Sequence, residues 1–208
     1  MTIVKRIELG TPVVRQGCIG LVAGTSVRTP CGARRIETLR PGDLIVTRDN
    51  GLRPVRIVFA RTVSAAEIAA DPALAPIRVE PRAVAPMMPA RPMLVGGEHR
   101  LLIPGWRLEG RDDRECVLVP ARDLADRGGP IRTLRDAGDT TYVNLVFDAH
   151  EIFAADGLPA ESFRPVEDAM DDLDPAVRDD IHRIFAGWRD KAAAPAGYDM
   201  PDHVELCS

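Results

Sequence analysis

The sequence predicts an all-β fold followed by one C-terminal amphipathic helix, on the basis of three observations. Residues 20–163 divide into short β-prone runs separated by turn signals, a spacing typical of β barrels and sandwiches. Asp49-Asn50-Gly51 is the strongest hairpin signal, because Asn-Gly tolerates the positive φ values of a type I′ turn. Beyond Asp174, apolar residues recur at helical spacing.

Each strand is expected between turn signals. Arg40-Pro-Gly-Asp43 has Pro and Gly where a type II turn needs them, directly before the expected strand 44–47. The Asn-Gly turn should join that strand to a partner in 55–63. Alanine-rich 64–75 is expected to be a short helix or a loop, and the prolines in 81–92 disfavour ladder pairing. The other expected strands are 26–29, 93–95, 101–103, 116–119, 140–147 and 151–154.

The C-terminal region predicts a helix that begins at Asp174. Asp is a good N-cap residue and Pro175 suits the first helical position. The apolar stripe, which we expect to pack against the β domain, consists of Val177, Ile181, Ile184, Phe185 and Trp188. Residues 192–208 are expected to form a flexible tail.

Composition narrows the functional classes. The 208 residues include 27 basic and 31 acidic side chains, so the formal net charge of −4 gives no basic field for nucleic acid or a membrane surface. The four cysteines form no CxxC pair, so neither a zinc site nor a disulfide framework is indicated, and no cofactor is expected. Without a visible signal peptide or an apolar run of about 20 residues, the default location is the cytoplasm, with signal-less export left open.

Four segments in order resemble the hedgehog/intein (Hint) domain family, especially its bacterial hedgehog/intein-like branch. They are the blocks Gly20-Leu-Val-Ala-Gly-Thr25, Ile36-Glu-Thr-Leu-Arg-Pro-Gly-Asp43, Leu94-Val-Gly-Gly-Glu-His99 and Tyr142-Val-Asn-Leu-Val-Phe-Asp148-Ala-His150. The resemblance implies a flattened β barrel with pseudo-twofold symmetry. It divides the chain into an N-terminal arm (1–17), a Hint-like domain (18–163), an extension with the amphipathic helix (164–191) and the tail.

The resemblance also implies a chemistry. In the family, a cysteine at the first position attacks the preceding carbonyl and converts an amide into a thioester, a step that needs an activated nucleophile. A histidine protonates the departing amide nitrogen, and a threonine three residues earlier orients it. Splicing members add an aspartate in the closing strand and a terminal His-Asn pair.

Most of these roles are vacant in this sequence. The residues at the family positions are Gly20 for the nucleophile, Gly96 for the threonine, Val143 for the aspartate, and Glu161 and Ser162 for His-Asn. Only the histidines His99 and His150 are kept. The resemblance therefore implies a degenerate, non-catalytic Hint domain that serves as a binding or structural module, with the C-terminal helix as a candidate surface for a protein partner.

One alternative retains self-processing. Cys18 follows Gly17, and a Gly-Cys junction is what hedgehog-type cleavage uses. Since residues i and i+2 face the same side of a strand, a two-residue bulge could bring Cys18 to the nucleophile position, a displacement of about 6–7 Å. An N-to-S acyl shift at Gly17-Cys18 would then use Cys18, His99 and His150.

A second alternative is a metal-dependent hydrolase. Imidazole and carboxylate ligands suit zinc, and His99, Asp148, His150 and Glu151 could be pooled into one site. Asp148 and His150 would share a strand face while Glu151 points the other way. No HExxH pair is present, which disfavours this interpretation.

Overall fold

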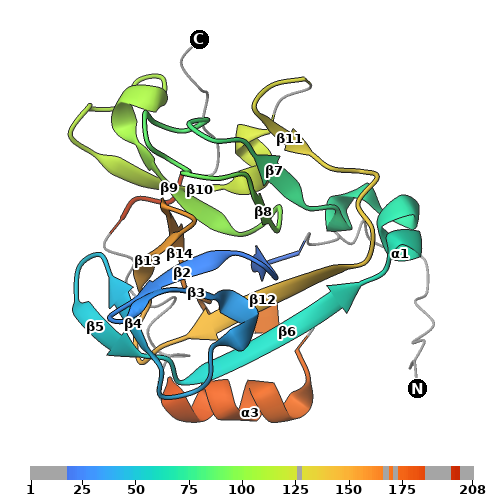
Figure 1. Ribbon diagram of the computed structural model, residues 1–208, viewed down its shortest axis with the longest axis vertical. Helices are drawn as coiled ribbons and strands as arrows, with labels where there is room; N and C mark the ends of the chain where they lie inside the picture. The colour runs from blue at the N-terminus through green and yellow to red at the C-terminus, as the bar shows by residue number, and fades with distance from the viewer. Residues whose placement is uncertain (1–17, 126–127, 166–168, 171–172, 186–197, 202–208) are drawn as a thin grey trace.

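The computed structural model describes residues 18–125, 128–165, 169–170, 173–185 and 198–201 (Figure 1). The predicted N-terminal arm, 1–17, lies outside the described residues. The chain is mostly β-sheet with a C-terminal helix, as the sequence predicts. The strands are β1 (Leu21–Val22), β2 (Ser26–Thr29), β3 (Gly32–Arg35), β4 (Leu44–Thr47), β5 (Gly51–Pro54), β6 (Ile57–Val63), β7 (Ile77–Val79), β8 (Met93–Val95), β9 (Arg100–Pro104), β10 (Cys116–Pro120), β11 (Ile131–Thr133), β12 (Thr140–Val146), β13 (Ile152–Ala155) and β14 (Leu158–Glu161).

The strands form two sheets. One has six strands in the order β11-β7-β8-β1-β12-β6, and the other has eight, with β10-β9-β14-β13-β2-β3 as its main path and β4 and β5 branching from β13. In the described part of the chain the sheets are not closed by hydrogen bonds into a continuous barrel. A shared core of Val, Leu, Ile and Ala side chains includes residues of both sheets, such as Leu21, Val27, Leu101 and Val143.

The hairpin predicted at Asn-Gly is present, but its turn is not the expected type I′, because Gly51 has a positive φ (69°) and Asn50 does not. Its second strand is also shorter than expected. Thr47 pairs with Gly51 and Leu44 with Pro54, so β5 alone completes the hairpin. The chain then changes sheets: the Val55 amide donates to the Asp43 carbonyl (2.9 Å), whereas the Arg56 amide donates to Val146 (2.7 Å). The expected strand 55–63 is therefore β6, which pairs along its whole length with β12 in the other sheet.

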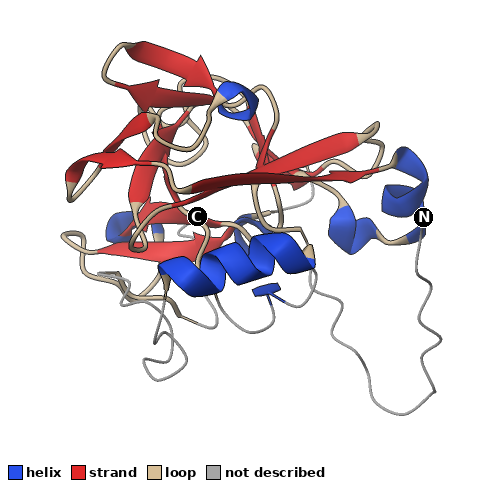
Figure 2. Cartoon of the chain, turned by 90° about the horizontal axis from the view of Figure 1, so that it is seen from below, coloured by secondary structure: helices blue, strands red, loops and turns tan. Residues whose placement is uncertain are grey.

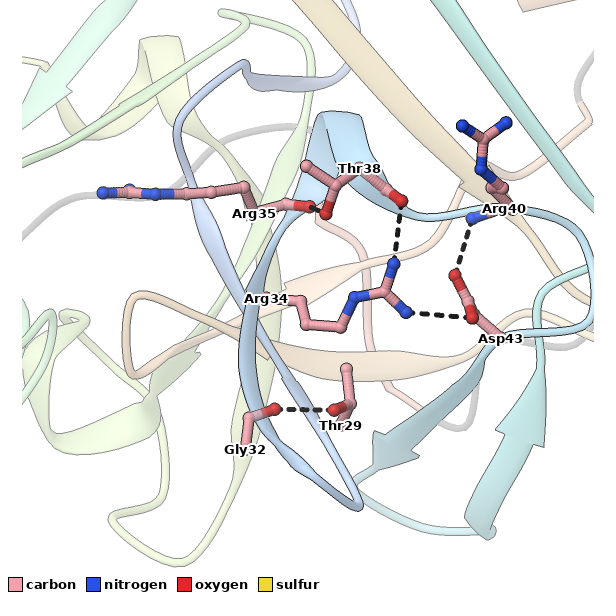
Figure 3. A network of polar contacts seen from close by, with 7 residues as sticks. All are labelled: Thr29, Gly32, Arg34, Arg35, Thr38, Arg40 and Asp43. Carbon is pink, nitrogen blue, oxygen red and sulfur yellow. Dashed lines mark hydrogen bonds and ion pairs between the residues drawn. The ribbon is translucent and has the colours of Figure 1, made fainter.

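The turn before β4 is braced by a polar network (Figure 3). The Arg34 guanidinium forms an ion pair with Asp43 (2.9 Å) and donates to the Thr38 carbonyl (2.8 Å). The Asp43 carboxylate also accepts the Arg40 amide (2.8 Å). These contacts, the backbone hydrogen bond first, hold the pKa of Asp43 below its ordinary value. The Pro-Gly-Asp segment thus acts as a fixed corner between β3 and β4.

The helix α3 (Pro175–Ile184) lies against β6 (Figures 1 and 2). Its apolar stripe packs on both sheet and loop residues, and Ile181 is fully buried beside Val146 and Phe163. Phe163 in turn meets Phe59 edge to face, with ring centroids 5.0 Å apart. The expected packing of the stripe against the β domain is confirmed, except for Trp188, which lies outside the described residues.

The predicted N-cap of α3 gives a direct test of helix stability. The Asp174 carboxylate accepts the Ala176 amide (2.8 Å) and Pro175 occupies the first turn. We expect Asp174→Ala to lower the free energy of unfolding by about 1 kcal/mol, because a backbone donor loses its partner. Asp179→Ala, exposed on the same helix, is the matched control. Urea denaturation measures both, and equal effects would contradict the capping role.

The Ala-rich segment between β6 and β7 is helical. It forms α1 (Ala65–Ala70) and the 3-10 helix η2 (Pro72–Leu74). Ser64 and Glu67 form a capping box in which each side chain satisfies the other's backbone amide. Across the described residues, no helix is both long and apolar enough to cross a membrane.

Candidate active site

Residues 18–20 lead into β1, which lies between β12 and β8. Leu21 pairs with Val143 on one side and with Val95 on the other. The nucleophile position, the closing strand and the segment before His99 are therefore brought together. What fills this junction decides which chemistry it can carry out.

Gly20, at the nucleophile position, is in a conformation that L side chains rarely adopt, with φ +129°. A Cβ built on it would lie 2.8 Å from Asn144 Nδ2 and 3.1 Å from the Val143 carbonyl oxygen. The Asn144 amide is held there by donating to the Ile19 carbonyl (3.1 Å). Neighbouring atoms already occupy the space that a nucleophilic side chain would need.

Gly96, at the threonine position, is even more closely approached. A Cβ on this residue would lie 2.1 Å from the Cys18 carbonyl oxygen and 2.7 Å from its carbonyl carbon. Two backbone hydrogen bonds hold the strands at this spacing, from the Gly96 amide to Gly20 (2.8 Å) and from the Glu98 amide to Cys18 (3.1 Å). Any side chain at position 96 would push residues 18–20 away.

His99 is buried immediately before β9, with 2% of its surface exposed. Neither ring nitrogen has a hydrogen-bond partner in the described part of the chain. Burial lowers the pKa of His99 to about 4; the charge of Glu161 opposes this shift, while His150 and Arg100 add to it. The imidazole is therefore neutral at physiological pH.

Glu161 and His150 form a second part of this polar core. His150 Nε2 lies 3.2 Å from Glu161 Oε2, and both side chains are almost fully buried. Glu161 Oε1 accepts the Arg100 amide (2.9 Å). Burial alone would raise the pKa of Glu161, but the His150 hydrogen bond, the neighbouring histidines and the Arg100 amide together lower it. The carboxylate is thus a buried anion surrounded by donors.

The remaining family positions have structural roles. The Ser162 hydroxyl accepts the Glu151 amide (2.9 Å), and the Ser162 amide donates back to the Glu151 carbonyl (2.7 Å). Val143, at the aspartate position, is buried in the main core. Positions 161 and 162 thus tie β13 to β14, and neither offers the side-chain amide that cyclises in splicing.

Cys18, the alternative nucleophile, is buried among apolar side chains of β6, β12 and α1. Its thiol hydrogen-bonds to Tyr142, whose hydroxyl donates to the Leu74 carbonyl (2.7 Å). Burial, and then the thiol, raise the pKa of Tyr142 well above its ordinary value. The charged groups that act on His99 are Glu161, His150 and Arg100, whereas Cys18 acts on Tyr142.

The structure does not group the residues of the metal hypothesis into one site among the described residues. Asp148 has 64% of its side chain exposed and pairs with Arg56 (3.1 Å), while His150 is buried against Glu161. Glu151 is buried and accepts from Asn50 (3.0 Å). Among the residues that the structure describes, no three His, Cys, Asp or Glu side chains are grouped to hold a metal ion.

Sequence reasoning missed Asn144, Tyr142 and Arg100. Asn144 is a lone polar residue in an otherwise apolar run, which is the signal that could have marked it, because a buried amide needs a partner. Tyr142 and Arg100 carry no comparable signal. Their roles depend on contacts between segments far apart in the sequence.

A family model described as the Hint domain matches residues 19–167, most of the chain. The chain belongs to the Hint domain family. The resemblance drawn from the four sequence blocks is therefore confirmed, and the strands β12 and β13 fall inside the matched region.

Solved structures similar to this Hint domain include three with intein or intein-like folds. A bacterial intein-like domain from Clostridium thermocellum is 13% identical, with 70% of this chain and 99% of that chain covered and a TM-score of 0.45. The gp41-1 intein is 14% identical (68% and 96% covered, TM-score 0.41), and the MchDnaB-1 intein 13% identical (67% and 98%, TM-score 0.42). No curated protein sequence matches the chain.

One side-chain donor reaches the backbone at the junction around position 20 of this Hint domain. Asn144 donates to the Ile19 carbonyl, the carbonyl that a nucleophile at position 20 would attack, in the manner of an oxyanion donor. His99 is kept but neutral and without a hydrogen-bond partner in the described part of the chain. The site can polarise a carbonyl, but position 20 supplies no group to attack it.

Proposed function

We propose that this Hint domain lacks self-cleaving activity and serves as a binding or structural module. The observation that carries the proposal is the filled space at Gly20, where the Asn144 amide and the Val143 carbonyl lie within 3.1 Å of any Cβ. Acyl transfer needs a nucleophile in contact with the scissile carbonyl. At Ile19-Gly20 that requirement is not met.

The surroundings of Cys18 support the same proposal for the Gly17-Cys18 bond. A cysteine nucleophile reacts as the thiolate, so a base or a cation must lie nearby. Tyr142 hydrogen-bonds to this thiol, and it is a phenol with a raised pKa that also donates to the Leu74 carbonyl. A neutral phenol of this kind is a poor general base at neutral pH.

The test is intact mass spectrometry of fresh protein carrying an N-terminal fusion, with and without a strong thiol nucleophile. We expect one uncleaved species near the full mass under both conditions. A thiol-dependent break between Gly17 and Cys18 that Cys18→Ala or His99→Ala abolishes would overturn the proposal and establish self-processing. Wild-type protein denatured before thiol addition is the control for non-enzymatic cleavage.

Two further parts of the proposal concern location and partner. We place the protein in the cytoplasm, as the sequence suggests. A protein partner that uses α3 would meet its outer face, since Ile181 and its apolar neighbours pack inward on β6. That outer face carries exposed Asp179 and Arg183.

A further inference from the structure

The outer edge of β10 is covered by four residues from the C-terminal end of the chain. β10 is the last strand on its side of the eight-stranded sheet, and such an edge offers unpaired backbone groups for another strand. Asp199 forms a parallel bridge with Val117, and the Leu118 amide donates to the Asp199 carbonyl (2.9 Å). Tyr198–Pro201 belong to the predicted tail, 192–208, the rest of which lies outside the described residues.

This segment also covers an apolar surface. Tyr198 and Met200 pack on a cluster formed by Leu102, Leu118 and Ile152, with Cys116 at its margin. Leu118 is completely buried although it lies on an edge strand. Residues i and i+2 of an extended segment face the same side, which explains why Tyr198 and Met200 both reach the cluster while Asp199 is exposed.

Polar contacts fix the register of the segment. The Tyr198 hydroxyl donates to the Asp49 carboxylate (2.7 Å) and accepts from Arg48 Nε (3.1 Å). Asp199 forms an ion pair with Arg111. Burial and then the Asp49 hydrogen bond raise the pKa of Tyr198, so the hydroxyl keeps the proton it donates. Each of the two residues is thus recognised by its own charged partner.

We propose that the β10 edge is a docking site for an extended peptide of tyrosine–acidic–methionine chemistry, and that Tyr198–Pro201 of the same chain is its resident occupant. Peptides that extend a sheet gain affinity from main-chain hydrogen bonds and specificity from alternating side-chain contacts, the arrangement found here. One bridge and a few side-chain contacts hold the segment, so it can exchange with a competing peptide. The inference rests on the proposed role as a binding module, for which it names the surface.

Cys116 provides the readout, because it is partly buried and packs on the same apolar cluster as Tyr198 and Met200. In the full chain, the double variant Tyr198→Ala/Met200→Ala should be alkylated at Cys116 about tenfold faster, the change that a docking loss of ~1.4 kcal/mol produces. Peptide-level mass spectrometry measures the rate. Exposed Cys31 should react at an unchanged rate, and buried Cys18 should stay protected unless the fold is lost.

A competing peptide completes the test. A synthetic peptide of residues 196–203 should slow Cys116 alkylation in the double variant, whereas the same peptide with alanine at the Tyr and Met positions should not. Unchanged Cys116 reactivity in the variant, or no effect of the peptide, would overturn the proposal. Protection of the wild-type chain that depends on protein concentration would assign the occupant to a second copy and would also overturn it.

A charge exchange keeps the proposal testable if the double variant fails to fold. Arg111→Glu should repel Asp199 and expose Cys116, and adding Asp199→Lys should restore protection. Failure of this rescue contradicts docking at β10. The result is separate from the fusion experiment, since a chain that cleaves itself could still dock its tail, and a chain that does not cleave could leave β10 open.

Discussion

Gly96→Ala should destabilise the protein by about 3 kcal/mol or prevent folding, because one methyl group would collide with the backbone of residue 18. The new Cβ would lie 2.1 Å from the Cys18 carbonyl oxygen, and backbone atoms cannot rotate away as a side chain can. Relief requires breaking the Gly96–Gly20 and Glu98–Cys18 hydrogen bonds, which seat β1 against the turn before His99. Urea denaturation followed by circular dichroism measures the loss.

Gly97→Ala is the matched control, since the adjacent residue has the same chemistry but open surroundings. The nearest atom to its Cβ would be Arg122 Cβ at 3.6 Å, an ordinary contact. We expect its free energy of unfolding to change by less than about 1 kcal/mol. Similar effects at both positions would mean that residues 18–20 can withdraw from the turn at little cost, and the steric account would then be wrong.

The same geometry explains why the family's cysteine at position 20 and threonine at position 96 would not fit into this Hint domain as it stands. Threonine at 96 would meet Cys18, and cysteine at 20 would meet Asn144 in a backbone conformation that disfavours side chains. A side chain at 20 would press this segment against β12, and a side chain at 96 would press on the same segment at Cys18, so the two effects should be coupled rather than additive. Placing cysteine at 20 and threonine at 96 would therefore require a movement of β1 as well as the two substitutions.

Much of the fold was predictable because its signals are local. The Asn50-Gly51 hairpin, the Pro-Gly-Asp corner and the Asp174 cap each depend on the backbone preferences of a few neighbouring residues. The prediction that strand 55–63 pairs with strand 44–47 was wrong, because this pairing is not decided by neighbouring residues. β6 pairs with β12, some 80 residues away, and no local pattern states which distant strand a chain will join after changing sheets.

The candidate site was predictable in its positions but not in its contacts. Gly20, Gly96 and His99 lie in blocks that resemble the family, and the structure brings residues 18–20 against both residues 96–98 and β12. The Asn144 amide beside Gly20, and the neutrality of His99, arise from packing between strands. Burial and hydrogen bonding of that kind depend on the assembled core, which spacing along the chain does not encode.

Because of His99, the free energy of unfolding should fall as the pH drops, and a single substitution should remove this fall. Its pKa is about 4 in the folded chain against an ordinary 6.5, so between these values the unfolded chain binds more protons than the folded one. The contribution of neutral His99 to the free energy of unfolding is therefore fully present above pH 6.5, and it falls by about 3 kcal/mol as the pH drops to 4. Glu161 has a lowered pKa, so its own contribution is lost only as the pH falls below its ordinary value of 4.5.

In His99→Leu the free energy of unfolding should no longer fall between pH 6.5 and 4, because leucine has a similar size and cannot be protonated. Neither ring nitrogen has a hydrogen bond of good geometry among the described residues, and the contact with the Glu161 backbone is a minor influence on the ring, so the change should alter stability at pH 7 by about 1 kcal/mol or less. His182→Gln, at a partly exposed position of α3, is the control, and its free energy of unfolding should fall with pH as in the wild type. Denaturant midpoints from pH 4 to 8 measure both. If His99→Leu still loses stability between pH 6.5 and 4, the proton uptake belongs to another group, and His99 is then not a buried, neutral imidazole.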